Sequence, residues 1–223
     1  MKKDNFDQFA ESYDEILREQ LKFFGEEHEY FSEYKIKIIK KYLDKTPNKI
    51  LEYGCGIGRN LKYLRQEFHD AEIYACDISE NSVEIAKKNN PSINVFRIDD
   101  NKVSQDFDLI FIAMVFHHVE VGERLNLLNS IYRLLSKKGS LFVFEHNPYN
   151  IVTRYLVNTC PFDGDAVLIK RREMESLISN ANFNICLGRY TLYFPYFLRK
   201  LRFLESILGH VPLGGQYFIK AFK

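Results

Sequence analysis

One stretch decides the fold of this chain: Lys49-Ile50-Leu51-Glu52-Tyr53-Gly54-Cys55-Gly56-Ile57-Gly58. Residues 49–53 are predicted to form a strand, and a helix is expected over 60–68. The glycines between them suit main chain that turns sharply with positive φ, and they let a ligand lie against bare backbone. Because Arg59 takes the place of a third dinucleotide-binding glycine, a pyrophosphate site is not expected. An acid just before the glycines, Glu52, suits a ligand with an amino-acid end; a tight turn without a ligand is the alternative.

Strands and helices alternate along the rest of the core. Further strands are expected at 71–76, 93–98, 107–115 and 140–144, and helices at 79–88 and 121–135. The nearly all-apolar run 107–115 is typical of a strand whose two faces are both covered. This order predicts right-handed βαβ units, and hence an α/β fold with a doubly wound, mostly parallel sheet of seven strands.

The remaining segments are predicted to extend this core within one domain. Apolar stripes at helical spacing predict a helical cap at 1–46, ahead of the core at 47–147. Residues 148–223 are expected to form an insertion after the fifth strand and an edge of the sheet. Their expected helices are 151–157, 172–180 and 198–208, and their expected strands are 184–193 and 216–222. The last helix and strand should pack at the sheet edge, with the strand antiparallel to its neighbour.

Composition restricts the class of protein. The chain has 223 residues, of which 46% are hydrophobic and 27% charged, and its formal net charge is +1. These values indicate an ordinary globular domain and do not favour nucleic-acid binding by bulk charge. The longest apolar run, 109–116, is far shorter than the roughly 20 residues of a membrane-spanning helix. With no secretory signal at its start and no cysteine pair spaced for zinc, we expect a cytoplasmic protein with free thiols and no metal site.

Two acids come directly after predicted strands. Asp77 stands 25 residues after Glu52, where a carboxylate can accept hydrogen bonds from ribose hydroxyls. A helix-terminal acid next to the cap Ser79 is the alternative. Asp99 follows the third strand and could accept a hydrogen bond from an adenine amine, with ordinary turn chemistry as the alternative.

In order and spacing, these residues resemble class I S-adenosylmethionine-dependent methyltransferases of the small-molecule branch (bacterial type 11/12-like). The resemblance covers about residues 48–145 and rests on the glycine loop, Asp77, Asp99, Phe107-Asp108-Leu109-Ile110 and Phe116-His117-His118-Val119. The opening Phe6-Asp7-Gln8-Phe9-Ala10-Glu11-Ser12-Tyr13-Asp14 is similar to the N-terminal cap of that branch. One departure is Tyr53, which occupies a position often held by a smaller residue. The resemblance implies a Rossmann-like methyltransferase fold and S-adenosyl-L-methionine as the cofactor.

The resemblance also implies which residues hold this cofactor. Together with Glu52, the implied residues are Tyr13, Gly54, Cys55, Gly56, Asp77, Ile78, Asp99, Ala113, Met114 and His118. The loop 54–56 would contact the methionine end, whose carboxylate would meet Tyr13. The ribose would lie at Asp77, the adenine between Ile78 and Asp99, and the sulfonium near residues 113–114.

Polar residues end four of the predicted strands: Glu52, Asp77, His117-His118 and Glu145-His146-Asn147. Ligands of open α/β sheets bind outside the carboxyl ends of the strands, so we expect one cleft there. Methyl transfer to a hydroxyl needs a base, and imidazole suits neutral pH. His146 is the first candidate for this catalytic base and His117 the second; a capping or core hydrogen bond is the alternative for each.

The segment after the fifth strand carries the candidate acceptor-binding residues, Glu145, Asn147, Tyr149 and Arg154, with Asp163 further along. A polar loop satisfied by its own hydrogen bonds is the alternative. The predicted function is methyl transfer to a small polar acceptor, an oxygen of a sugar or of a lipid-linked glycan precursor. The alternatives are nitrogen or carbon methylation of an aminosugar or quinone-like lipid, and a non-enzymatic regulatory domain. No nucleic-acid partner is expected. The apolar stripe of the basic, amphipathic stretch 196–208 is expected to cover the sheet, and peripheral contact with the inner face of the membrane is the alternative.

Overall fold

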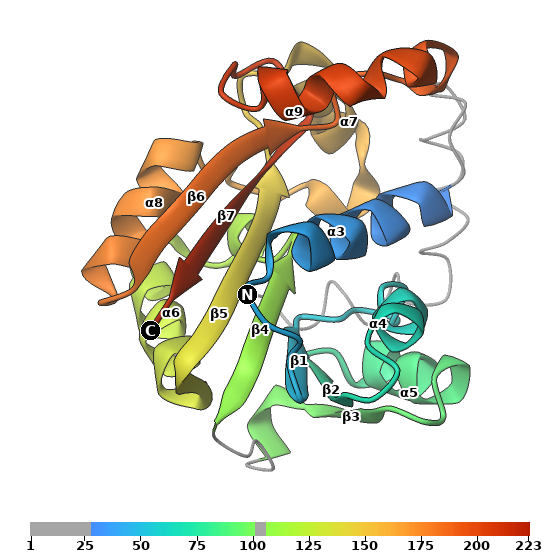
Figure 1. Ribbon diagram of the computed structural model, residues 1–223, viewed down its shortest axis with the longest axis vertical. Coiled ribbons are helices and arrows are strands. Elements are labelled where there is room, and N and C mark those ends of the chain that lie inside the picture. Colours follow the sequence, from blue (N-terminus) through green and yellow to red (C-terminus); the bar gives the residue numbers. More distant parts are fainter. Residues whose placement is uncertain (1–27, 101–105) are drawn as a thin grey trace.

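The computed structural model describes residues 28–100 and 106–223 (Figure 1). Its centre is one seven-stranded sheet with the order β3-β2-β1-β4-β5-β7-β6. The strands are β1 Lys49–Tyr53, β2 Glu72–Asp77, β3 Asn94–Arg97, β4 Phe107–Ala113, β5 Leu135–His146, β6 Asn184–Thr191 and β7 Gln216–Phe222. Strands β1 to β5 pair in parallel, and β7 is antiparallel to both β5 and β6. The predicted doubly wound, mostly parallel sheet is confirmed.

Helices cover both faces of this sheet. They are α3 His28–Tyr42, α4 Leu61–Glu67, α5 Glu80–Asn89, α6 Arg124–Leu134, α7 Ile151–Thr159, α8 Arg171–Asn180 and α9 Glu205–Leu208. Apolar residues of α3, α4 and α5 pack on one face, and those of α6 and α8 on the other. Successive β4 residues alternate between the two cores, and Leu109 to Ile112 are all fully buried. This double burial is the physical reason for the all-apolar run in the sequence.

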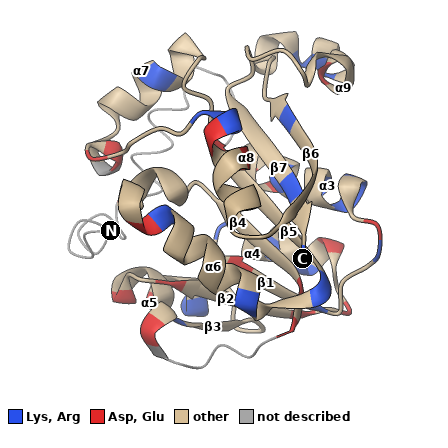
Figure 2. Ribbon diagram, turned by 90° about the vertical axis from the view of Figure 1, so that its left-hand side faces the viewer, with Lys and Arg blue, Asp and Glu red and all other residues tan. Residues whose placement is uncertain are grey.

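The order of the strands reverses between β1 and β4, which flank each other at the centre of the sheet. Ligands of doubly wound folds bind at this point, beyond the carboxyl ends of the strands. Basic and acidic residues are interspersed over the described elements (Figure 2). Among the described residues, no helix combines the length and the apolar character required to cross a membrane.

Two predicted elements differ from the structure. The fifth strand was expected at 140–144, but β5 already begins at Leu135, because a bulge opposite Phe107 lets the chain pair before and after Gly139. The expected helix 198–208 is a 3₁₀ helix, Tyr196–Leu204, followed by the single turn of α9. The buried residue at the start of α9 is Glu205. Its carboxylate accepts hydrogen bonds from the Tyr34 hydroxyl and from the Tyr193 N–H. The apolar stripe therefore does not cover the sheet, and Phe197 and Phe203 are exposed.

The other predicted elements lie within a few residues of their expected positions. The second apolar stripe of the cap is α3, whereas the first stripe, 6–17, lies outside the described residues. The final strand is β7, which is antiparallel as expected. It lies between β5 and β6, so β6 and not β7 forms the edge of the sheet. The division of the chain into 1–46, 47–147 and 148–223 stays a prediction.

Strand β7 provides a matched pair of phenylalanines that tests its structural role. Phe218 is 2% exposed and packs against the rings of Phe144 and Tyr42, at centroid distances of 5.7 Å and 5.4 Å. Replacing Phe218 with Ala should lower the free energy of unfolding by about 3–5 kcal/mol. The control Phe222→Ala, at a position 41% exposed on the same strand, should change it by about 0.5 kcal/mol or less. Urea unfolding measures both values, and equal losses would show that β7 is not part of the core.

Candidate functional site

The glycine loop lies at the carboxyl end of β1 with an unusual backbone. Gly54, Gly56 and Gly58 have φ angles of 76°, 53° and 81°, in the region that favours glycine. A Cβ on Gly54 would lie 2.4 Å from a methyl group of Val115, so the loop packs against the chain that follows β4. A Cβ on Gly56 would meet no atom of the described residues within 4 Å. Among these residues the loop therefore leaves open space beside the main chain at Gly56.

Asp77 fastens this loop to the end of β2. Its buried carboxylate accepts hydrogen bonds from the N–H groups of Gly56 at 2.8 Å and Ser79 at 2.9 Å. A carboxylate can accept several hydrogen bonds at once, and those from Gly56 and Ser79 hold Asp77 next to the glycine loop. Ile78 is partly exposed beside it. Asp99 is exposed and pairs with Arg97 at 3.1 Å.

A buried acid and a buried base lie behind the loop. Oε1 of Glu52 accepts a hydrogen bond from the Asn60 amide at 2.6 Å, whereas Oε2 is buried and has no hydrogen-bond partner among the described residues. Burial raises the pKa of Glu52 to about 8. Burial, and then the charge of Arg59, lower the pKa of Lys35 on α3 to about 8. An unsatisfied buried carboxyl oxygen of this kind fits the ammonium group of an amino-acid ligand.

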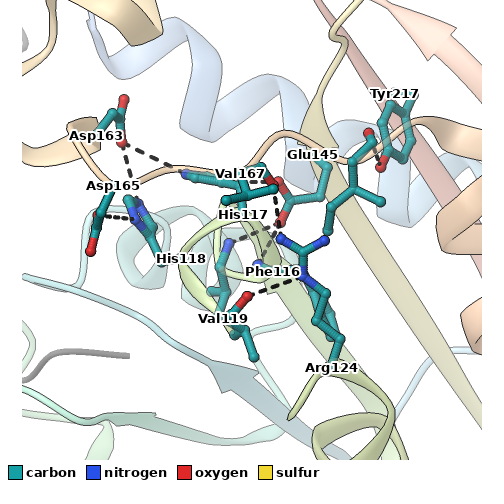
Figure 3. Close-up of polar contacts among 12 residues, drawn as sticks. Phe116, His117, His118, Val119, Arg124, Glu145, Asp163, Asp165, Val167 and Tyr217 are labelled. Carbon is teal, nitrogen blue, oxygen red and sulfur yellow. Dashed lines mark hydrogen bonds and ion pairs between the residues drawn. The ribbon is translucent and has the colours of Figure 1, made fainter. Parts of the chain in front are cut away.

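A second buried acid, Glu145 at the end of β5, organises the chain after β4 (Figure 3). Its Oε1 accepts the N–H groups of Val115 at 3.0 Å and Phe116 at 2.7 Å. Its Oε2 lies 2.6 Å from Nδ1 of His117, which belongs to the 3₁₀ helix Phe116–His118. Met114, just before this turn, has a φ of 59°, a conformation that non-glycine residues adopt mainly at constrained sites.

Three imidazoles gather beside Glu145. The ring centroid of His117 lies 4.1 Å from that of His118 and 5.2 Å from that of His146. Burial alone would lower the pKa of His117, but the charges of Glu145 and Asp163 outweigh it and raise the pKa to about 9. Burial and the charge of His117 lower the pKa of His146 to about 4, and Nδ1 of His146 has no hydrogen-bond partner among the described residues. His146 is therefore a neutral imidazole at neutral pH.

The candidate acceptor-binding residues have different surroundings. Asn147 is fully buried, and its amide donates to the carbonyls of Pro212 at 3.1 Å and Gly214 at 2.7 Å. Its hydrogen bonds, like those of Glu145, are therefore directed into the fold. Tyr149 and Arg154 are exposed at the start of the insertion.

The structure thus brings most of the predicted site residues to one edge of the sheet. This set comprises Glu52, Gly54, Cys55, Gly56, Asp77, Ile78, Ala113, Met114, His117, His118, Glu145 and His146. Tyr13 lies outside the described residues. The sequence analysis missed Lys35, although a signal existed: this lysine occupies a position on the apolar stripe of α3 and is buried there. It also did not place Asp163 beside the histidines.

Comparisons with known proteins agree with this geometry. A family model described as "Methyltransferase domain" matches residues 25–187. A demethylmenaquinone methyltransferase of Thermotoga maritima is 27% identical over 169 residues, which are 71% of this chain and 70% of the relative. A solved "possible histamine N-methyltransferase" from the same organism has a TM-score of 0.69, 18% identity and full coverage of both chains. The magnesium protoporphyrin IX methyltransferase of Synechocystis, solved with bound SAH, has a TM-score of 0.62 and 14% identity over 88% of this chain and 83% of its own.

Glu52 should make the stability of the protein depend on pH. Its pKa is about 8 in the folded protein against an ordinary value of 4.5. Between these pH values the folded state holds the proton more tightly than the unfolded state, so the free energy of unfolding falls as the pH rises. Replacing Glu52 with Gln removes this titration while keeping an acceptor for Asn60. We expect the variant to gain stability relative to the wild type as the pH is raised through this range, measured by urea unfolding.

The matched control is Glu84→Gln, because Glu84 is exposed and pairs with Lys87 only at the surface. Its pH profile should follow that of the wild type. A constant difference between Glu52→Gln and the wild type at every pH would contradict the assignment.

Proposed function

Since this chain belongs to the methyltransferase domain family and uses S-adenosylmethionine as its methyl donor, we propose that it methylates an oxygen of a small polar acceptor, a sugar or a lipid-linked glycan precursor. One observation carries the proposal: the His146 imidazole, whose Nδ1 has no hydrogen-bond partner among the described residues, lies beside the buried His117–Glu145 pair at the carboxyl ends of β4 and β5. A hydroxyl acceptor needs such a group to receive its proton.

The proposed cofactor site is the edge around the glycine loop. The bare main chain at 54–56 would hold the methionine end, and Oε2 of Glu52 would face its ammonium group. Asp77 would bind the ribose hydroxyls, and Ile78 and Asp99 would contact the adenine. The buried carboxylates and the space at Gly56 support this arrangement. When bound, the cofactor supplies a methyl group on a positively charged sulfur, which would lie near Ala113, Met114 and His118.

The acceptor would occupy the space between this sulfur and the histidines. As the new O–C bond forms, the S–C bond breaks and its electron pair stays on the sulfur. The hydroxyl proton passes to His146, whose Nδ1 has no partner among the described residues. Glu145 holds His117 and the turn after β4, and the His117 ring lies beside that of His146. Alignment of the two reactants in a dry site accounts for much of the rate, up to roughly 7–11 kcal/mol.

A second candidate function is carbon methylation of a quinone-like lipid. It is favoured by the Thermotoga relative, which is named for demethylmenaquinone, and by exposed apolar side chains on α7 and on the 3₁₀ helix Tyr196–Leu204. These are Ile151, Tyr155, Phe197 and Phe203. With Arg199 and Lys200 beside them, they suit the surface of an anionic membrane. Peripheral membrane contact through 196–208 stays a prediction.

Gly56 tests the cofactor site with little change to the fold. A Cβ there meets no atom of residues 28–100 or 106–223 within 4 Å, so Gly56→Ala should fold, at a cost of about 1–2 kcal/mol for the positive φ. Because the Cβ enters the space proposed for the ligand, the affinity for S-adenosylhomocysteine should fall at least about tenfold, measured by calorimetry. The control is Gly122→Ala, whose Cβ also meets no atom within 4 Å in the part of the chain that the structure describes, and which lies in the 3₁₀ helix Val121–Glu123. If both variants bind S-adenosylhomocysteine with equal affinity, the proposed position of the cofactor next to Gly56 is wrong.

The role of His146 is tested by the product as well as by the rate. The variant His146→Gln should lower kcat by about 10²–10⁴-fold, with the dissociation constant of the cofactor unchanged, whereas the exposed His210→Gln should behave as the wild type. Transfer of a deuterated methyl group to sugar and quinol acceptors, followed by NMR of the product, shows which atom is methylated. A methyl group on carbon would replace the oxygen proposal with the second candidate.

A further inference from the structure

Three metal-ligating side chains meet beside the proposed acceptor space. They are His117 and His118, from the 3₁₀ helix after β4, and Asp163, from the short 3₁₀ helix Pro161–Asp163 after α7 (Figure 3). One ligand atom of each lies within 4.8 Å of the other two, and no other such group of three occurs among residues 28–100 and 106–223. The spacing of the cysteines predicted no metal site, but these three side chains come from histidines and an aspartate that lie far apart in the sequence.

The distances between these groups are close to those between two ligands of one ion. Oδ1 of Asp163 lies 3.3 Å from Nε2 of His118 and 3.7 Å from Nε2 of His117. The longer separation exceeds hydrogen-bond range. Ligand atoms about 2.1 Å from one ion are about 3.0–3.4 Å apart in octahedral or tetrahedral geometry. Small side-chain shifts would therefore bring all three atoms onto one ion.

Each histidine also has a carboxylate near its other ring nitrogen. Nδ1 of His117 lies 2.6 Å from Oε2 of Glu145, and Nδ1 of His118 lies 3.7 Å from Oδ1 of Asp165. Metal-ligating histidines commonly have an outer carboxylate at hydrogen-bond distance, which fixes the ring and directs the remaining nitrogen at the ion. Glu145 is such a group for His117, whereas Asp165 lies beyond hydrogen-bond range of His118. Here that remaining nitrogen is Nε2, which in both residues faces Asp163.

The segment that carries Asp163 is held in place by the fold. The N–H of Val167 donates to the His117 carbonyl at 2.8 Å, and the buried Arg124 donates to the Val167 carbonyl at 2.8 Å. The Tyr217 hydroxyl donates to the Ile169 carbonyl at 3.0 Å. These hydrogen bonds hold the segment after Asp163 against the rest of the fold. They keep the carboxylate of Asp163 near His117 and His118, which precede it by 46 and 45 residues.

We propose that His117, His118 and Asp163 bind one divalent transition-metal ion through Nε2, Nε2 and a carboxylate oxygen. Two imidazoles and one carboxylate suit ions such as Zn²⁺ and Fe²⁺. Three protein ligands leave coordination positions open, as in catalytic rather than structural sites. The role of the ion rests on the proposed function: an acceptor oxygen that takes an open position would be held near the methyl donor and would lose its proton more readily.

Metal binding is measured on the full chain without reference to activity. After treatment with a chelator, the wild type should bind one Zn²⁺ per chain in calorimetry. The variants His118→Gln and Asp163→Asn should each weaken this binding at least about tenfold. The control is His69→Gln, which removes the histidine of an exposed His–Asp pair with a 3.1 Å separation and should leave binding unchanged. Co²⁺ in place of Zn²⁺ should give visible bands without the intense near-ultraviolet band of a thiolate ligand, which excludes the exposed Cys186.

Wild-type protein that binds no stoichiometric Zn²⁺, or variants that bind it as the wild type does, would overturn the proposal. If one variant fails to fold, the other and the Co²⁺ spectrum of the wild type decide. Full methyl transfer by the chelated enzyme would overturn the role of the ion and leave oxygen methylation standing. Zn²⁺ binding with a carbon-methylated product would overturn the proposed function and leave the metal site standing.

Discussion

The whole arrangement depends on one constraint: both faces of the parallel sheet are covered by helices. Residues of β1, β4 and β5 are therefore buried on both sides, and apolar side chains fill these positions. Polar groups needed for chemistry can stand only where the strands end. The central strands end together at the point where the strand order reverses. The site is thus located by packing before any ligand is considered.

The acids at these strand ends are largely buried, and they differ in how many hydrogen-bond partners the protein gives them. Glu145 has two backbone N–H groups and an imidazole on its two oxygens, so it serves as a fixed part of the structure. Glu52 has one partner for one oxygen and none among the described residues for the other. An unsatisfied buried carboxyl group lowers stability unless a ligand completes it. Glu145 therefore has a structural role in the site, whereas Glu52 is suited to binding a ligand.

The sequence predicted the sheet and the backbone of the glycine loop well, because local signals determine both. Glycines with positive φ and an acid at the end of β2 can be recognised within a few neighbouring residues. The 3₁₀ helix at Tyr196–Leu204 and the early start of β5 could not be predicted, because they depend on Glu205 and on pairing with Phe107. Likewise, the approach of Asp163 to the histidines is produced by hydrogen bonds from Arg124 and Val167, which lie far apart in the sequence.

The same non-local contacts explain how one scaffold can hold a metal site and a methyl-transfer site side by side. Nδ1 of His117 is engaged by Glu145 whatever lies at Nε2, so the ring keeps its orientation with a proton, an ion or an acceptor on its far side. His146 stands 5.2 Å away, ring to ring, on the strand that also carries Glu145. A single buried carboxylate thus fixes the His117 ring and the turn after β4, on which the proposed metal site depends. Because β4 and β5 are paired strands of the central sheet, the relative positions of His117 and His146 stay fixed while ligands bind and leave.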